Sequence, residues 1–235
     1  MQSTKDENFN IEADMFKVVI PQGKYRLPKD VKPAKDIVGL HYYFNNDRGL
    51  VLKPSGKLFG LEGITKYNKT LILPTIYERT NGLEVDEDYF LNKADVCISH
   101  IKYDIFVDGY PSDYIGEISD RIKLKSDKYS INNYDKLSYK ESIRITPKAT
   151  SSRFVFTIYN KGKELERSKN KAFRKTLDYK TIQDSKHMIR FEYQMTDFDR
   201  MRKEFGIPQK VKPTISAILY CERNVVADFF DNLVD

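Results

Sequence analysis

The sequence has no tryptophan, and only two cysteines and three histidines occur among its 235 residues. Cys97 and Cys221 stand far apart, without a Cys-x-x-Cys or Cys/His cluster, so neither a zinc site nor a disulfide framework is supported. The chain also lacks an apolar signal core and any apolar run long enough to span a bilayer. We therefore expect a reduced, cytoplasmic protein without a membrane partner.

Several ligand-binding motifs are missing as well. The sequence contains neither a Walker-type GK[ST] motif nor GxGxxG, which argues against a nucleotide-driven motor or a Rossmann cofactor. His41, His100 and His187 do not form a His-hydrophobic-His metal pair. A lone histidine is more often a core or surface residue than a ligand, and only His100, just before an acidic strand, stays a candidate.

What is abundant is positive charge and aromatic side chains. Lys and Arg number 40 against 34 Asp and Glu, and the chain has 16 Tyr and 14 Phe. Interleaved cations and aromatics suit single-stranded nucleic acid, although an AT-rich genome gives the same composition. The length fits one large domain, and we expect a flexible leader over 1–14, the domain itself over 15–210, and a C-terminal helix over 211–235 that packs on it.

Three segments alternate apolar and polar residues as strands do. Over 153–161, Phe154, Phe156 and Ile158 fall on one face, and Tyr159 and Lys161 on the other. Over 101–108, the polar face carries two carboxylates, Asp104 and Asp108, and over 187–195 it carries Arg190 and Glu192. These patterns predict an α+β fold, with a central, mainly antiparallel sheet that has helices packed on one face and a polar catalytic face.

Other elements follow from turn and capping signals. We expect further strands at 15–20, 40–44, 49–53, 57–63 and 141–146, a long loop at 125–140, and helices at 85–95, 112–122, 163–180, 198–205 and from 214 onward.

The pooled polar faces suggest a chemistry. Acids on neighbouring strands repel unless they are neutralised, and oxygen ligands favour Mg²⁺ or Mn²⁺. The alternative is a salt-bridge network on a solvated sheet face. Tyr159 could act as a nucleophile if Lys161 or a metal favoured its phenolate, although most tyrosines are packing residues.

The chain resembles the replication endonuclease of filamentous phages and the related phage and plasmid rolling-circle initiators. Four blocks carry the resemblance in order, PSGKLFGLEGITKYNK, ISHIKYDIFVDG, SSRFVFTIYNKGKELE and HMIRFEYQMTDFDRMRKEFGIP. The last two are the most specific, a strand ending in Tyr-x-Lys and a strand with Arg-Phe-Glu, each followed by a helix. His100 departs from the phage enzyme, which has arginine there.

The resemblance implies a sequence-specific, metal-dependent DNA nickase that joins its tyrosine to the 5′ end of the cut strand, leaves a 3′-OH and can rejoin the strand. It implies Tyr159 as the nucleophile with Lys161 as its companion, and Asp104, Asp108 and Glu192 as ligands of Mg²⁺ or Mn²⁺. The implied partners are origin DNA, single-stranded or melted, and a host helicase and polymerase. We expect the DNA to contact Arg153, Lys163, Arg167, Lys169, Lys171, Arg174, Lys175 and Arg190.

Two other functions fit the same residues. A non-catalytic single-stranded-DNA-binding or partner-binding protein would use the aromatics and cations without cutting DNA. A palm-like nucleotidyltransferase would bind its metal through Asp104 and Asp108 and would not depend on Tyr159.

Overall fold

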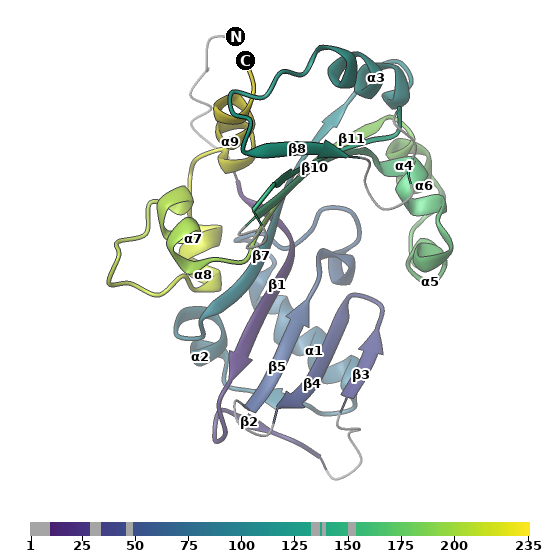
Figure 1. Ribbon diagram of the computed structural model, residues 1–235. Coiled ribbons are helices and arrows are strands. Elements are labelled where there is room, and N and C mark those ends of the chain that lie inside the picture. The colour runs from purple at the N-terminus through teal and green to yellow at the C-terminus, as the bar shows by residue number, and fades with distance from the viewer. Residues whose placement is uncertain (1–9, 29–33, 46–48, 133–136, 138–139, 150–153) are drawn as a thin grey trace.

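A computed structural model describes residues 10–28, 34–45, 49–132, 137, 140–149 and 154–235. Nine of the described strands form one antiparallel sheet in the order β3-β4-β5-β1-β7-β11-β10-β9-β8, and β2 and β6 form a separate pair (Figure 1). The fold is therefore α+β, as the sequence predicts, and β7, β11 and β10 lie side by side near the middle of the large sheet.

The strands are β1 (Glu12–Ile20), β2 (Tyr25–Arg26), β3 (Ala34–Ile37), β4 (Leu40–Asn45), β5 (Gly49–Pro54), β6 (Glu84–Val85), β7 (Val96–Phe106), β8 (Tyr129–Asn132), β9 (Ser142–Pro147), β10 (Phe154–Asn160) and β11 (Met188–Met195). The helices are α1 (Ile72–Thr80), α2 (Glu87–Asn92), α3 (Pro111–Arg121), α4 (Lys161–Glu166), α5 (Lys171–Arg174), α6 (Tyr179–Ser185), α7 (Phe198–Phe205), α8 (Ile215–Leu219) and α9 (Val225–Leu233). Short 3-10 helices occupy Gly56–Phe59, Lys69–Leu71 and Ser168–Asn170.

The apolar face of the sheet holds an aromatic core. Phe154 and Phe156 of β10 and Tyr193 of β11 are buried against α9, where the rings of Tyr193 and Phe229 stack with centroids 4.0 Å apart. Phe156 and Phe230 also stack, with centroids 5.5 Å apart. Offset and edge-to-face ring pairs add to the free energy of apolar burial. Because α9 covers this face, the side chains at the alternate positions of β10 and β11 point to the opposite face of the sheet.

A bulge in β1 changes which side chains face the core. Ile11 and Ala13 are buried before it and Phe16 is buried after it, so the buried positions switch from odd to even numbers. The register with β7 shifts at the same place, between Ala13 and Met15. A bulge inserts one residue into one strand of an antiparallel pair and re-aims the local side chains. Here the inserted residue is Asp14.

Several predicted boundaries are corrected. Strand β1 begins at Glu12, inside the expected leader, because residues 12 and 13 pair with β7. Residues 57–63, expected as a strand, begin instead with a 3-10 helix, whose first turn is capped when Ser55 Oγ accepts a hydrogen bond from the Lys57 amide. The expected loop at 125–140 contains β8, which pairs with β9.

The helix predicted at 198–205 is α7, but two other predicted helices are each divided into shorter ones. Lys161 is the first residue of α4 and not part of the strand, because the Asn160 side chain caps the helix by accepting from the Lys163 amide. Extended backbone at Arg167 ends α4, and α5 and α6 follow where one helix over 163–180 was predicted. The C-terminal helix is likewise two helices, because Asn224 caps a second start by accepting from the Ala227 amide.

Candidate active site

The polar face of the four central strands contains a cavity of about 280 Å³. Its lining includes Asp14 of β1, His100 of β7, Tyr159 of β10, Lys161 of α4 and Glu192 of β11. In the sheet register, Arg190 lies between Tyr159 and Asp104 on neighbouring strands, and Glu192 lies between Thr157 and Lys102. The three polar faces predicted from the sequence therefore meet on one sheet, where Tyr159 contacts Glu192 and Asp104 pairs with Arg190.

Tyr159 lines this cavity and is buried, with 2 % of its surface exposed. Its hydroxyl donates a hydrogen bond to Glu192 Oε2 at 3.0 Å. Burial, and next the negative charge of Glu192, raise the pKa of the Tyr159 phenol well above its usual value. The phenol is therefore protonated in this state, and a nucleophilic role requires a neighbour that accepts its proton and a positive charge that stabilises the phenolate.

Glu192 connects the tyrosine to His100. Its other oxygen, Oε1, lies 2.9 Å from His100 Nδ1. Burial opposes ionisation of Glu192, but the hydrogen bond and charge of His100 outweigh it and lower the pKa of the carboxyl. Because a carboxylate only accepts, Nδ1 carries the proton of this contact, and in a neutral ring Nε2 then presents a lone pair.

Asp14, His100 and Glu192 form a cluster with the geometry of a cation site. One potential ligand atom from each residue lies within 4.8 Å of the others. His100 Nε2 is buried without a hydrogen-bond partner in the described part of the chain. Glu192 Oε1 already contacts His100 Nδ1, so a cation held by both residues would take the place of the proton in this contact. The three residues therefore fit a divalent cation.

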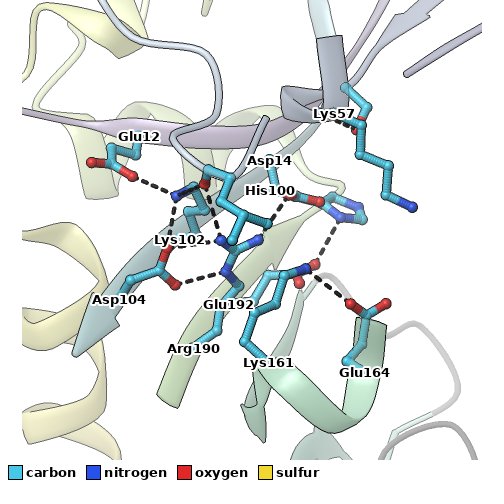
Figure 2. A network of polar contacts seen from close by, with 12 residues as sticks. Glu12, Asp14, Lys57, His100, Lys102, Asp104, Lys161, Glu164, Arg190 and Glu192 are labelled. Atoms are coloured by element: carbon cyan, nitrogen blue, oxygen red, sulfur yellow. Dashed lines mark hydrogen bonds and ion pairs between the residues drawn. The ribbon is translucent and has the colours of Figure 1, made fainter. Parts of the chain in front are cut away.

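Asp104 and Arg190 form a buried ion-pair network beside this cluster (Figure 2). Arg190 is 1 % exposed, and its Nε and Nη2 donate to the two Asp104 oxygens at 2.7 and 2.8 Å. Lys102 Nζ donates to Asp104 Oδ2 at 2.8 Å and also contacts Glu12. Burial opposes ionisation of Asp104, but the Arg190 charge outweighs it and holds the pKa of the carboxyl well below its usual value.

The same network positions Asp14 and the loop above it. Arg190 Nη1 donates to Asp14 Oδ1 at 3.2 Å, which fixes the bulged side chain. Leu61 O accepts from both Lys102 Nζ and Arg190 Nη2, at 2.7 and 3.2 Å. Gly63 allows this close approach, because a Cβ there would lie 2.8 Å from both Ala13 O and Lys102 Cε, and its φ is +84°.

Lys161 lies on the side of the cavity formed by α4. Its Nζ is 2.9 Å from Glu164 Oε2 and 5.9 Å from the centroid of the Tyr159 ring. Burial, and next the charge of Arg190, lower the pKa of the Lys161 ammonium. A lysine with a lowered pKa releases a proton more readily than one in water.

The structure divides the residues predicted from the sequence. Tyr159, Lys161 and Glu192 line the cavity, whereas Asp104 is enclosed by its cations and Asp108 is exposed beyond the end of β7. In the described residues, Asp104 and Asp108 join no three-residue cluster of potential metal ligands. Arg190 lacks the exposure that its predicted DNA contact requires, and Arg153 lies outside the described residues.

The predicted basic segment lies beside the cavity. Lys169 lines it, Lys163, Lys171 and Lys175 are exposed, and Arg167 and Arg174 are half-buried. Asp14 was not predicted as a site residue, although the switch of apolar residues from odd to even positions between Ala13 and Phe16 is visible in the sequence. That switch is the signal of the bulge that brings Asp14 to the site.

Fold and site define an α+β protein with a tyrosine–carboxylate pair next to a candidate cation site. No family model and no curated protein matches the sequence. Among solved structures, the chain is similar to a rolling circle replication initiator protein from Geobacillus stearothermophilus, with 15 % identity and a TM-score of 0.46 over 96 % of this chain and 86 % of that chain. In the described residues, no helix is both long and apolar enough to cross a membrane.

Proposed function

We propose that the chain is a DNA-nicking and strand-transferring enzyme of the rolling-circle initiator kind, with Tyr159 as its nucleophile. The hydrogen bond from the Tyr159 hydroxyl to Glu192 is the observation that carries the proposal. It joins a buried phenol to a carboxylate that also belongs to the candidate cation site. A general base within hydrogen-bond reach is the arrangement that an oxygen nucleophile needs.

The residues of the site account for each proton and bond. Tyr159 Oη attacks the phosphorus of a phosphodiester, while its proton passes to Glu192 Oε2. The new bond joins the tyrosine to the 5′ phosphate, and the bond to the 3′-oxygen breaks. Lys161 is our candidate for donating a proton to the leaving 3′-oxygen, because it lines the same cavity and has a lowered pKa. Attack by a 3′-OH on the phosphotyrosine reverses these steps.

Asp14, His100 and Glu192 are the residues that would hold the metal. A bound cation would polarise the phosphate and stabilise negative charge that develops on oxygen. Carboxylate ligands suit Mg²⁺ or Mn²⁺, and the imidazole favours Mn²⁺ of the two because nitrogen suits transition metals. This ligand set replaces Asp104 and Asp108 in the proposal and keeps Glu192.

The proposed substrate is origin DNA, presented as a single strand or a melted duplex. The cations around α4 and α5, Lys163, Arg167, Lys169, Lys171, Arg174 and Lys175, lie next to the cavity and would neutralise its phosphates. Extension of the 3′-OH would require a polymerase, and unwinding would require a helicase, both from the host.

A covalent-adduct assay tests this function. Plasmid carrying candidate origins is incubated with the protein and Mn²⁺ or Mg²⁺, and DNA–protein adducts are separated on a denaturing gel. We expect an adduct with the wild-type chain and none with Tyr159→Phe or in EDTA. Tyr179→Phe is the matched control, because Tyr179 is 77 % exposed on α6 and should form the adduct normally.

Each other function has its own outcome in this assay. An undiminished adduct in Tyr159→Phe would refute the nucleophile, and DNA binding without any adduct would favour a non-catalytic single-strand-binding protein. We do not propose the nucleotidyltransferase, because Asp104 is held by Arg190 and Lys102 and Asp108 lies in an exposed bend.

A further inference from the structure

The cavity is lined by cations that the proposed chemistry does not use. Lys57 comes from the 3-10 helix Gly56–Phe59 and Arg144 from β9, and both join Lys161 and Lys169 in the lining. The carboxylates in the same lining are Asp14, Glu164 and Glu192. Four cations against three carboxylates leave a positive balance even before a divalent cation is added, so the cavity favours an anion.

Arg144 is placed on the site face by the sheet. It lies opposite Thr157 of β10, which lies opposite Glu192 of β11. Two strand spacings separate Arg144 from Glu192, about 10 Å between backbones. Within the described part of the chain, the Arg144 guanidinium has no hydrogen bond or ion pair, so its planar set of donors is available to a ligand.

Lys57 is held in place by a neutral acceptor. Its Nζ donates to Asn170 Oδ1 at 3.0 Å. Asn170 is completely buried and is itself fixed, because its Nδ2 donates to Glu164 O and Glu164 Oε1 at 2.7 and 2.6 Å. An ammonium has three donors, and this contact uses one of them. The buried amide therefore fixes the position of the Lys57 ammonium in the cavity lining.

We infer that Lys57 and Arg144 bind the non-bridging oxygens of a phosphodiester of single-stranded DNA in this cavity. The inference rests on the proposed function, because it places the strand next to Tyr159. Charged donors to phosphate are among the stronger hydrogen bonds in proteins, and arginine matches the geometry of two phosphate oxygens. Both residues are new to the site, because the DNA contacts predicted from the sequence were Arg153, Arg190 and the basic segment after Tyr159.

Binding measurements can test this pair without DNA cleavage. Lys57→Gln, Arg144→Gln and Arg144→Lys are each made in a Tyr159→Phe chain, together with Lys180→Gln as a control on the exposed side of α6. Affinity for a labelled single-stranded oligonucleotide of mixed sequence is measured by fluorescence anisotropy over a series of salt concentrations with Mn²⁺ present. Circular dichroism checks that every variant is folded.

We expect Lys57→Gln and Arg144→Gln to weaken binding about tenfold each. The slope of log affinity against log salt should become shallower by about 0.7 for each lost phosphate contact. Arg144→Lys should keep the parent slope, because it keeps the charge, and Lys180→Gln should match the parent in affinity and slope.

Unchanged affinity and slope in folded Lys57→Gln and Arg144→Gln would overturn the inference. The proposed nicking would survive that result, because it is tested by the Tyr159 adduct. Conversely, weakened binding by these variants in a chain that forms no adduct would keep the phosphate site and refute the nicking. No measurable binding by the parent chain would overturn the phosphate site together with the proposed DNA substrate.

Discussion

Replacing Arg190 by methionine tests whether this arginine stabilises the fold or contacts DNA. Methionine is unbranched and replaces the apolar stem of the arginine side chain, but it removes the charge and the donors. The change removes two hydrogen bonds to Asp104, one to Asp14 and one to Leu61 O. Asp104 then stays largely buried with Lys102 as its remaining cation.

The expected loss of unfolding free energy follows from this burial. Removing one partner of a buried ion pair leaves an uncompensated charge and costs about 3–5 kcal/mol. For a chain of this length, each kcal/mol lowers the melting temperature by about 2–4 °C. Urea unfolding followed by circular dichroism should show this loss for Arg190→Met. Arg121→Met is the matched control, because that side chain is 81 % exposed and should change stability by less than about 0.5 kcal/mol.

A double variant tests the cause. If the cost of Arg190→Met is the charge it leaves on Asp104, adding Asp104→Leu should recover part of it, and the two changes should be far from additive. Wild-type stability in Arg190→Met, together with weaker DNA binding, would refute this reasoning. It would show that Arg190 contacts DNA, as the sequence pattern indicates.

Three further measurements follow from the described contacts. The pKa of Asp104 is lowered on folding, so its network stabilises the protein above the unfolded pKa of 3.8 and loses that contribution as pH falls towards the folded pKa. Urea midpoints between about pH 5 and pH 3 should therefore fall more steeply for wild type than for Asp104→Asn, and parallel curves would contradict this. Gly63→Ala and Gly206→Ala both put a Cβ on a residue with positive φ, which alone costs about 1–2 kcal/mol. Gly63→Ala should lower stability more, because of the two glycines only Gly63 has other atoms within contact distance of the new Cβ. Equal urea midpoints for the two variants would refute the close packing at Gly63. Mn²⁺ at a hundred times the dissociation constant of the wild-type chain should stabilise wild type and Asp231→Asn by about 2.7 kcal/mol. At the same Mn²⁺ concentration, Asp14→Asn should be stabilised much less, because it lacks one of the proposed ligands. An equal shift of the melting temperature in all three proteins would exclude this cation site.

The sequence predicted the centre of the fold because its period-2 patterns were strong. The three alternating segments are β7, β10 and β11, and they are neighbours in the sheet. Alternation assigns a side chain to a face, but it does not say which partner the side chain meets across the strands. Asp104 fell on the predicted polar face, yet its pairing with Arg190 depends on the register, which only the structure gives. The salt-bridge alternative therefore holds for Asp104, whereas the candidate cation site is formed by other residues, Asp14, His100 and Glu192.

The contribution of Asp14 depends on tertiary structure in a different way. The predicted strand began at Met15, although apolar residues at odd-numbered positions end at Ala13 and those at even-numbered positions start at Phe16. A single-residue insertion reconciles the two patterns within one strand. The switch is visible in the sequence, but only the pairing with β7 shows that both patterns belong to one strand, and Asp14 was therefore assigned to the leader.

Glu192 has two roles that depend on each other. Its Oε2 accepts from Tyr159 and its Oε1 contacts His100, so one carboxylate serves both the nucleophile and the candidate cation site. Without a cation, the raised pKa of Tyr159 and the lowered pKa of Glu192 both oppose transfer of the proton between them. The phenol is therefore kept protonated until positive charge is added beside it. A cation at the candidate site would offset the charges of Glu192 and Asp14, which add to burial in raising the pKa of Tyr159, so the proposed strand cleavage would depend on the metal.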